Sequence, residues 1–411
     1  MSKSRNVFSK IITVYTEEGF LAIIIKSLQK LQAVTRKKSA KKRKIILLAD
    51  QKNILDADWT ERIQDNIAKR IEGPCTVAWV MSPPGESGGG HHNIFRFIKF
   101  LDEAGYRNHI YLYSTTDKST VEEVIERIQH FYKLDPSNIS WLGSEDSIKV
   151  GDAIFATGWE TAYPVYNCLR NVKKFYFVQD FEPYFYPVGS EYVLAENTYK
   201  FGFKGITAGP WLTKKINIDY GMDCSYYAFG VDTKIYTMKN YDARKEIVFY
   251  ARPITARRGF ELGVMALAKF HEMHPDYIIN FIGWDVSDYD IPFPYINHKS
   301  LKIEALAGVY NRSAAALVMS LTNVSLLPLE LLATGTIPVV NEGENNRMVV
   351  NNEYVKYAQT TPAALARALH EVVIDSDLQE KAKAAATSVK QNDWKSSGEE
   401  FIRIFSSELR G

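Results

Sequence analysis

The chain contains 411 residues, which is more than one hydrophobic core usually organises and predicts two domains of roughly 150 to 200 residues. Apolar residues make up 46% and charged residues 24% of the sequence, a composition that excludes disordered and fibrous proteins. The formal net charge is only +2, and outside one basic run near the N-terminus the chain is close to neutral, which argues against a nucleic-acid-binding protein.

The three cysteines, Cys75, Cys168 and Cys224, are odd in number and lack the spacing of a disulfide framework or a zinc site. We therefore expect buried thiols in a reducing compartment. No apolar run reaches the ~20 residues that span a bilayer, and residues 20–25 are not followed by a small-residue cleavage site. These features predict a cytoplasmic protein.

Residues 1–60 are predicted to form a helical extension. Phe20, Ile24 and Leu28 recur at helical spacing, and a run of lysines and arginines follows at residues 37–44. Two interpretations fit this pattern. The helix docks on its own domain beside a solvated charge run, or it lies in a membrane interface with its basic flank on anionic lipid.

Strands alternating with helices are predicted in residues 61–230. A β-favouring run at Thr76–Met81 ends in a glycine-rich loop, and a helix at residues 94–101 precedes a strand at 109–113. Further strands are predicted at residues 153–157, 174–178 and 205–208. This alternation predicts an open parallel sheet.

The pattern restarts after a boundary at residues 229–232 and predicts a second domain at residues 231–390. Its strands are predicted at residues 247–250, 278–281, 315–319 and 337–340, and its helices at 260–272, 303–312, 329–333 and 363–372. Thr361 and Pro362 supply an N-cap and a first helical position for the last of these. In the segment 391–411, a final helix around residues 400–409 is expected to cross back to the first domain. The predicted fold class is α/β, with two Rossmann-like domains facing across a cleft.

The glycine-rich segment after the first strand is the first candidate ligand site. Gly89 and Gly90 let the backbone approach a ligand closely, and the N-terminus of the following helix favours an anion. The segment lacks the spacing of a dinucleotide fingerprint and the lysine of a P-loop. His91 and His92 are candidate contacts for a second substrate, and the alternative is a mobile loop with two solvated histidines.

The second candidate site follows the strand at residues 247–250. Arg252 and Arg258 are six residues apart and precede a helix, so they can flank one diphosphate, and Lys302 is a further candidate cation. The alternative is a surface cluster without ligand contacts. Because these cations are available, and Asp288-Tyr289-Asp290 falls in a predicted surface turn, no metal ion or other cofactor is expected.

The third candidate site lies at residues 320–340. Thr322 and Asn323 follow a predicted strand. Glu330 lies near the start of a short predicted helix at the carboxyl end of the sheet, where ligands of such folds bind. As a lone carboxylate, Glu330 could instead cap its helix.

A polar group follows the strand at residues 174–178, where Gln179, Asp180 and Glu182 should project from the carboxyl end of the sheet. Asp180 could position or deprotonate a substrate hydroxyl. Equally, it could close a turn by accepting hydrogen bonds from backbone N–H groups ahead of Pro183.

Over residues 76–390 these motifs resemble the family-4-like retaining GT-B glycosyltransferases. That family carries Gly-Arg, Lys-Gly and a Glu-x7-Glu motif that ends in Gly-Thr-Pro-Val, and the matching positions here are Arg252, Arg258-Gly259, Glu330, Gly335 and Pro338-Val339, with Gly230-Val231-Asp232 resembling the hinge. The resemblance implies that Glu330 holds the donor ribose. Two departures are Thr322 in place of the first carboxylate, which contacts the donor sugar in that family, and an inserted Ile337.

The segments around Gly89-Gly90-His91-His92, Gln179-Asp180 and Thr322-Asn323 are most similar to bacterial rhamnosyltransferases of S-layer or rhamnan glycans. This resemblance implies retaining transfer of L-rhamnose from dTDP-L-rhamnose to a lipid-linked cell-surface glycan, at the inner face of the cell membrane. The donor would bind in the second domain and the acceptor in the first, with closure about residues 229–232. The alternatives are another nucleotide sugar, a GT-B-like sugar-nucleotide epimerase, and a non-catalytic subunit that binds a nucleotide sugar.

The candidate residues fall into three groups. The catalytic candidates are Arg252, Arg258 and Asp180; the donor-binding candidates are Gly89, Gly90, Arg252, Arg258, Lys302, Thr322, Asn323 and Glu330; and the acceptor-binding candidates are His91, His92, Gln179, Asp180 and Glu182.

Overall fold

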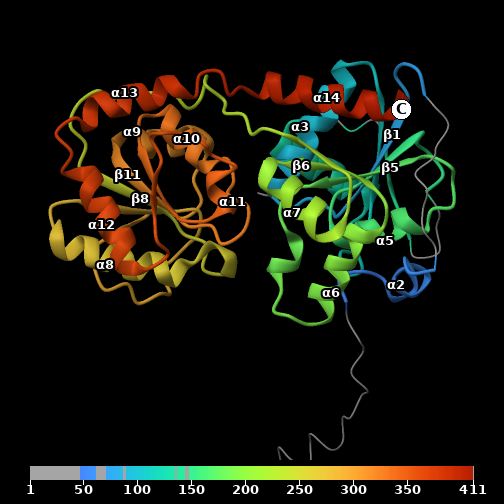
Figure 1. Cartoon of the computed structure of the whole chain (residues 1–411), viewed down its shortest axis with the longest axis horizontal. Coiled ribbons are helices and arrows are strands. Elements are labelled where there is room, and N and C mark those ends of the chain that lie inside the picture. Colours follow the sequence, from blue (N-terminus) through green and yellow to red (C-terminus); the bar gives the residue numbers. More distant parts are fainter. Residues whose placement is uncertain are drawn as a thin grey trace, which may run out of the picture. The chain divides into compact units, whose positions relative to one another are not determined.

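Two parallel β-sheets follow one another along the chain in the computed structural model (Figure 1). The structure describes residues 47–61, 71–86, 89–134, 136, 138–143 and 148–410. The predicted N-terminal amphipathic helix and its basic run lie outside the described residues. From Leu47 onward the chain forms one compact unit.

The first sheet has the strand order β3-β2-β1-β4-β5-β6-β7 within the described residues, and every neighbouring pair is parallel. Its strands are β1 Thr76–Met81, β2 Arg107–Leu112, β3 Ile139–Trp141, β4 Ala153–Ala156, β5 Lys173–Val178, β6 Lys204–Ala208 and β7 Cys224–Tyr227. The open parallel sheet predicted from the sequence is confirmed. The short strands β3 and β7 were not predicted.

The helices of this part of the chain are α2 Gln51–Asp56, α3 Gly89–Glu103, α4 Val121–Arg127, α5 Trp159–Asn167, α6 Ser190–Asn197 and α7 Pro210–Tyr220, with a 3-10 turn η2 at Glu182–Phe185. Helix α3 begins earlier than predicted, so Gly89, Gly90, His91 and His92 belong to a helix and not to the preceding loop. The glycine at position 90 leaves room for the Gln179 side chain, whose Nε2 lies 3.4 Å from where a Cβ would be.

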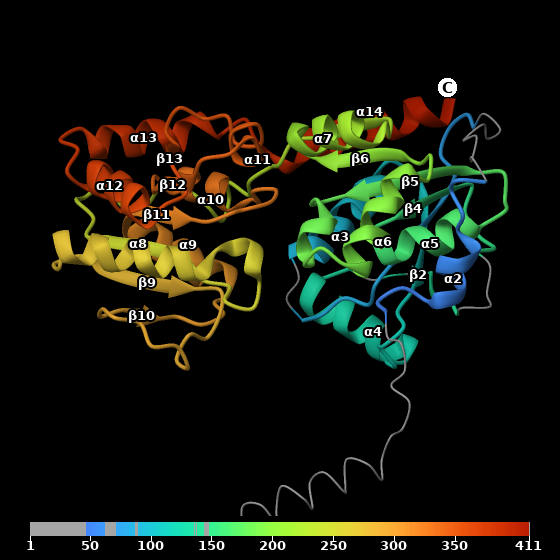
Figure 2. The same cartoon turned by 60° about the horizontal axis from the view of Figure 1, so that its bottom comes forward.

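The second sheet has the order β10-β9-β8-β11-β12-β13 among the residues the structure describes (Figure 2). Its elements are β8 Glu246–Tyr250, α8 Phe260–Met273, β9 Ile278–Ile282, β10 Ile296–Asn297, α9 Ile303–Arg312, β11 Ser313–Val318, α10 Leu327–Ala333, β12 Ile337–Asn341, α11 Glu344–Arg347, β13 Lys356–Ala358, α12 Pro362–Val373 and α13 Leu378–Ser388. The predicted N-cap of α12 is confirmed, because the Thr361 hydroxyl accepts a hydrogen bond from Ala364 N at 3.2 Å.

Helix α14, Trp394–Arg410, packs on the first sheet although it follows the second in sequence (Figure 1). The Phe401 ring stacks with Trp79 and Phe155, at centroid distances of 6.4 and 5.9 Å. Gly398 allows the close approach to α3, because a Cβ there would lie 2.6 Å from the Phe100 ring. An aromatic cluster shared by β1, β4 and α14 therefore fills this core.

The two connections between the sheets run side by side. Val231 N donates a hydrogen bond to Asn392 O at 2.7 Å, and a Cβ on Gly230 would lie 2.6 Å from Trp394 N. Glycine is thus required at position 230 because backbone occupies the space of a side chain.

All three cysteines are free thiols. Cys75 and Cys168 are buried and Cys224 is half-buried, and burial raises the pKa of Cys75 to about 11 and that of Cys224 to about 12. None of the helices in the described residues is long and apolar enough to cross a membrane.

Candidate functional site

Three arginines follow β8 at its carboxyl end. Arg252 Nε donates to the Tyr250 hydroxyl at 2.9 Å, and Arg258 Nη1 donates to Ser320 Oγ at 3.0 Å. Burial is the main cause that lowers the pKa of Arg258, and the positive charges of Arg257 and Arg252 lower it further, against an opposing effect of Asp180. A concentration of like charges on one loop favours a polyanionic ligand such as a diphosphate.

Arg257 also belongs to this cluster, although it was not predicted from the sequence. Its Nε donates to Asp180 Oδ2 at 3.3 Å, and its guanidinium carbon lies 4.0 Å from the centroid of the Phe185 ring. The signal for it was the Arg257-Arg258 pair, but sequence spacing does not tell which of two adjacent arginines contacts the other sheet.

Asp180 lies at the end of β5 and is buried. Its Oδ1 accepts hydrogen bonds from Phe181 N at 2.9 Å and Asn323 N at 3.0 Å, and its Oδ2 accepts from Thr322 Oγ1 at 3.1 Å as well as from Arg257. The bond to Phe181 N is the local turn contact considered as an alternative. With both oxygens occupied, the carboxylate is better suited to organise loops than to remove a proton from a substrate.

Thr322 and Asn323 are buried, with 1% and 2% of their surface exposed. Asn323 Nδ2 donates to Gln179 O at 3.2 Å and to Ala208 O at 2.9 Å, so the loop after β11 is bonded to the ends of β5 and β6. Asn323 Oδ1 is buried and has no hydrogen-bond partner among the described residues.

Asparagines at the end of β12 and in α11 fix the same loop from the other side. Ser320 N donates to Asn341 Oδ1 at 2.7 Å, and Ser320 O accepts from Asn341, Asn345 and Asn346. The segment from Ser320 to Asn323 is therefore held by both sheets.

The other residues predicted to contact an acceptor surround the start of α3. Gln179 Oε1 accepts from Asn93 Nδ2 at 3.3 Å. His91 Nε2 lies 2.9 Å from Ser82 O, and the His92 ring lies 4.4 Å from the Tyr132 ring; burial lowers the pKa of both histidines. The structure thus pairs both histidines with groups of their own domain, and Gln179, the residue before Asp180, connects α3 to the Asp180 loop.

Glu182 turns inward, which differs from the predicted acceptor contact. Its Oε2 accepts from Trp159 N at 2.5 Å and from the Tyr176 hydroxyl at 3.2 Å. Burial, followed by the charge of nearby Glu160, raises the pKa of Glu182 well above its ordinary value. The reason is that η2 begins at Glu182 and folds its side chain against the amino end of α5, so it fixes a turn.

Glu330 lies in the first turn of α10, as predicted. Burial raises its pKa to about 7, and Tyr236 and Arg96 act in the opposite direction. Arg96, on α3, was not predicted: its Nη1 donates to Asn93 Oδ1 at 2.8 Å and its guanidinium lies 3.7 Å from the centroid of the Trp394 ring. The charge of Arg96, on a helix beside the first sheet, therefore acts on Glu330, on a helix beside the second.

Lys302 stands apart from this site. It is the exposed N-cap residue of α9, its side chain makes no capping hydrogen bond, and as far as the described residues extend it does not join the network around Arg258. The only support for its predicted role is its sequence position.

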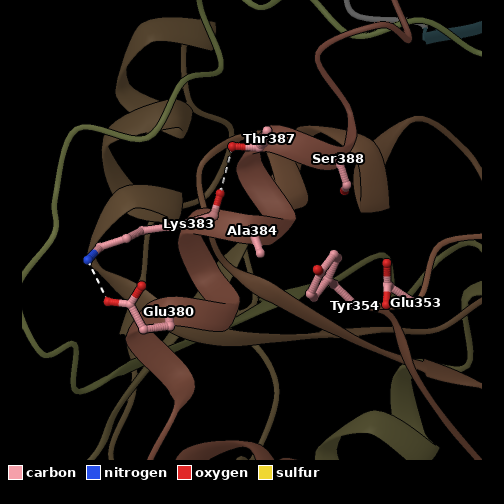
Figure 3. Close-up of a pocket in the computed structure, with 7 residues that line it drawn as sticks. All are labelled: Glu353, Tyr354, Glu380, Lys383, Ala384, Thr387 and Ser388. Carbon is pink, nitrogen blue, oxygen red and sulfur yellow. Dashed lines mark hydrogen bonds and ion pairs between the residues drawn. The ribbon is translucent and has the colours of Figure 1, made fainter.

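An open surface hollow of about 470 Å³ lies on α13 and the loop before β13 (Figure 3). It is lined by Glu353, Tyr354, Glu380, Lys383, Ala384, Thr387 and Ser388, and none of the predicted site residues lines it. In Figure 3 the Lys383 ammonium points to Glu380, at 2.7 Å. Within the described residues there is no group of three or more His, Cys, Asp or Glu side chains that could hold a metal ion.

Sequence comparison relates the chain to proteins of glycan assembly. Family models match in two places: the WsaF C-terminal domain over residues 245–370 and the WsaF N-terminal domain over residues 143–208. The O-antigen biosynthesis protein RfbC of Myxococcus xanthus is 28% identical over an alignment of 333 residues, which covers 78% of this chain and 26% of RfbC. The chain thus spans about a quarter of the length of that relative.

Solved structures share the arrangement of two parallel sheets. TarM has a TM-score of 0.64 at 10% identity and is covered over 100% of its chain by 85% of this one. HepE of Anabaena, in complex with UDP and glucose, has a TM-score of 0.62 at 10% identity, with 99% of its chain and 80% of this one covered. At these identities the likeness establishes the fold alone, and the predicted GT-B class is confirmed.

Proposed function

We propose that this chain is a GT-B glycosyltransferase that transfers a sugar from a nucleotide diphosphate donor to a bacterial glycan. The WsaF-domain matches, the similarity to RfbC and the fold shared with TarM support a glycosyltransferase of glycan biosynthesis. We further propose L-rhamnose as the sugar, dTDP-L-rhamnose as the donor, and retention at the anomeric carbon, as the motif resemblance implies.

The arginine cluster after β8 is the observation that carries this proposal. When the glycosidic bond of the donor breaks, the leaving diphosphate gains negative charge. Preorganised cations stabilise that charge more than they stabilise the bound donor, which raises turnover. Arg252 and Arg258 are held in place by the Tyr250 hydroxyl and Ser320 Oγ, and this preorganisation supports a role in departure of the diphosphate without a metal ion.

The proposal of rhamnose rests on the motif resemblance, in which Thr322 replaces the carboxylate that contacts the donor sugar. Rhamnose carries no hydroxyl at C6 and is more apolar than glucose or mannose. A buried Thr322 that already donates to Asp180 is compatible with such a sugar. The acceptor we propose is a lipid-linked glycan, approached from a membrane surface that residues 1–44 would contact.

A donor panel tests the proposal. Thermal unfolding is measured with dTDP, UDP and GDP and with a sugar conjugate of each, because a ligand that binds the native state raises the midpoint. We expect the largest increases with dTDP and dTDP-L-rhamnose, and transfer of rhamnose to a rhamnose-terminated acceptor by mass spectrometry. Arg258→Ala should lose the increase, whereas the matched control Arg403→Ala, an exposed residue paired with Glu400, should keep it.

Each contrary result has a distinct meaning. A larger shift with GDP-sugar overturns the donor assignment. Formation of an epimer without acceptor indicates the epimerase, and binding without turnover on any acceptor indicates the nucleotide-sugar-binding subunit.

A further inference from the structure

We propose that Asp180, a residue of the first sheet, is a positioning residue that completes the donor site of the second sheet. In this role the carboxylate holds the arginine loop after β8 and the loop after β11 in one arrangement. The inference rests on the proposed function, and it deepens that function by assigning the donor site a residue from the opposite sheet.

The origin of the hydrogen-bond donors to Asp180 is the first argument. Among the described residues, four groups donate to the Asp180 carboxylate, and Phe181 N is the local one. The other three, Asn323 N, Thr322 Oγ1 and Arg257 Nε, come from two separate loops of the second sheet. A carboxylate needed only for its own turn would not require donors from two distant loops.

Burial is the second argument. Asp180 has 8% of its surface exposed and Thr322 1%, so water competes poorly for these bonds. Hydrogen bonds to a charged acceptor in such surroundings are stronger than neutral ones, and losing one leaves a buried donor unpaired. The Asn323 amide reinforces the contact through Gln179 O and Ala208 O.

Charge is the third argument. Arg257 and Arg258 are adjacent, and their like charges repel each other on the same loop. Asp180 bonds directly to Arg257, and it reaches Arg258 through the loop whose Ser320 Oγ accepts from Arg258. One carboxylate therefore sets the direction of both guanidinium groups, and a displacement of about 1 Å in such a group is sufficient to cost 10²-fold in rate.

The test compares Asp180→Asn, Thr322→Val, Arg257→Ala and the Asp180→Asn/Arg257→Ala double variant with the full-length protein. Asp276→Asn is the matched control, since it also removes a carboxylate paired with a cation, Lys245, but at an exposed site. Turnover and KM for dTDP-L-rhamnose are measured against pH, and dTDP affinity is measured by calorimetry.

We expect Asp180→Asn to lower kcat by about 10²-fold, to weaken dTDP binding, and to leave the shape of the pH profile unchanged. Thr322→Val removes one hydroxyl and should give a smaller loss of the same kind while remaining folded. The kcat of the double variant should be little lower than that of Arg257→Ala alone, because both changes break the same hydrogen bond between Arg257 and Asp180. Asp276→Asn should behave like the wild type.

Two results overturn the inference. One is a kcat of Asp180→Asn within about twofold of the wild type, which is no loss on the scale of positioning effects. The other is loss of the acidic limb of the pH profile with unchanged dTDP affinity, which identifies Asp180 as a general base. If the wild type turns over no nucleotide sugar, the proposed function fails separately. In that case hydrogen exchange tests the inference. If the carboxylate holds that loop, Asp180→Ala must speed amide exchange at residues 322–323.

Discussion

Replacing Glu330 by Gln should stabilise the free protein above pH 7 and weaken donor binding at the same time. Burial raises the pKa of this carboxyl to about 7 from an ordinary value of 4.5, so the native state holds a proton that the unfolded chain releases at lower pH. The free energy of unfolding therefore falls as pH rises from 4.5 through 7. Below 4.5 the carboxyl is protonated in both states and this contribution to stability is fully present.

The size of this effect follows from the two pKa values. Their difference corresponds to about 3 kcal/mol of stability lost between the two pH limits. Gln cannot ionise and avoids this loss, so Glu330→Gln should exceed the wild type by up to about 3 kcal/mol at about pH 8.5 and by much less at about pH 5.

The affinity for the donor should change with pH in the opposite direction to the stability. If Glu330 accepts a hydrogen bond from the deoxyribose hydroxyl of the donor, in line with the ribose contact that the motif resemblance implies, only its ionised form binds well. Affinity for dTDP-L-rhamnose should then fall by roughly tenfold for each pH unit below 7 in the wild type. The donor is the suitable ligand because its diphosphate is substituted at both ends and does not titrate in this range. Glu330→Gln should bind weakly throughout.

Urea unfolding at the two pH values measures the first effect, and calorimetry measures the second. Glu380→Gln is the control, because Glu380 is exposed and is paired with Lys383 across one helical turn. Equal stability differences between Glu330→Gln and the wild type at both pH values would refute the reasoning, since a carboxyl whose pKa is raised in the native state must make the difference depend on pH.

Three further outcomes are expected. Arg252→Ala should lower kcat by about 10² to 10³ in steady-state kinetics, and Arg252→Lys should recover only part of this, because lysine lacks the planar guanidinium fork; an unchanged kcat would move the donor site elsewhere. Gly230→Ala should lower the free energy of unfolding in urea by about 1 to 3 kcal/mol, because its Cβ would lie 2.6 Å from Trp394 N. Removal of residues 1–44 should weaken sedimentation with anionic vesicles, where each basic residue contributes about 1 kcal/mol, and spare turnover on a soluble acceptor; equal sedimentation would contradict the interfacial helix.

Most of both sheets could be predicted from the sequence because buried parallel strands are continuous apolar runs separated by helical periodicity. Strand Thr76–Met81 and helix Ile303–Arg312 agree with the prediction to the residue. The missed strands Ile139–Trp141, Cys224–Tyr227, Ile296–Asn297 and Lys356–Ala358 have two to four residues and lie at the sheet edges. Such runs are too short and too exposed for a period to be detected.

The site was predictable only as far as chain order determines it. Arg252 and Arg258 follow the carboxyl end of β8, as the predicted strand implied, and ligands of such folds bind at that end of the sheet. The bond between Arg257 and Asp180 joins residues 77 positions apart. The inward turn of Glu182 depends on Trp159 in another element. Neither contact leaves a local signal, because each is set by the packing of distant loops.

Because α14 follows the second sheet in the sequence but packs on the first, it also affects the order in which the two domains can fold during translation. Phe401 and Phe405 complete an aromatic cluster that includes Trp79 and Phe155, which are synthesised far earlier. Until α14 emerges from the ribosome, that aromatic cluster of the first sheet stays uncovered while the whole second sheet is translated. Vectorial folding should therefore finish the second domain first, and stalled nascent chains that lack α14 should be clients of chaperones that bind aromatic surfaces.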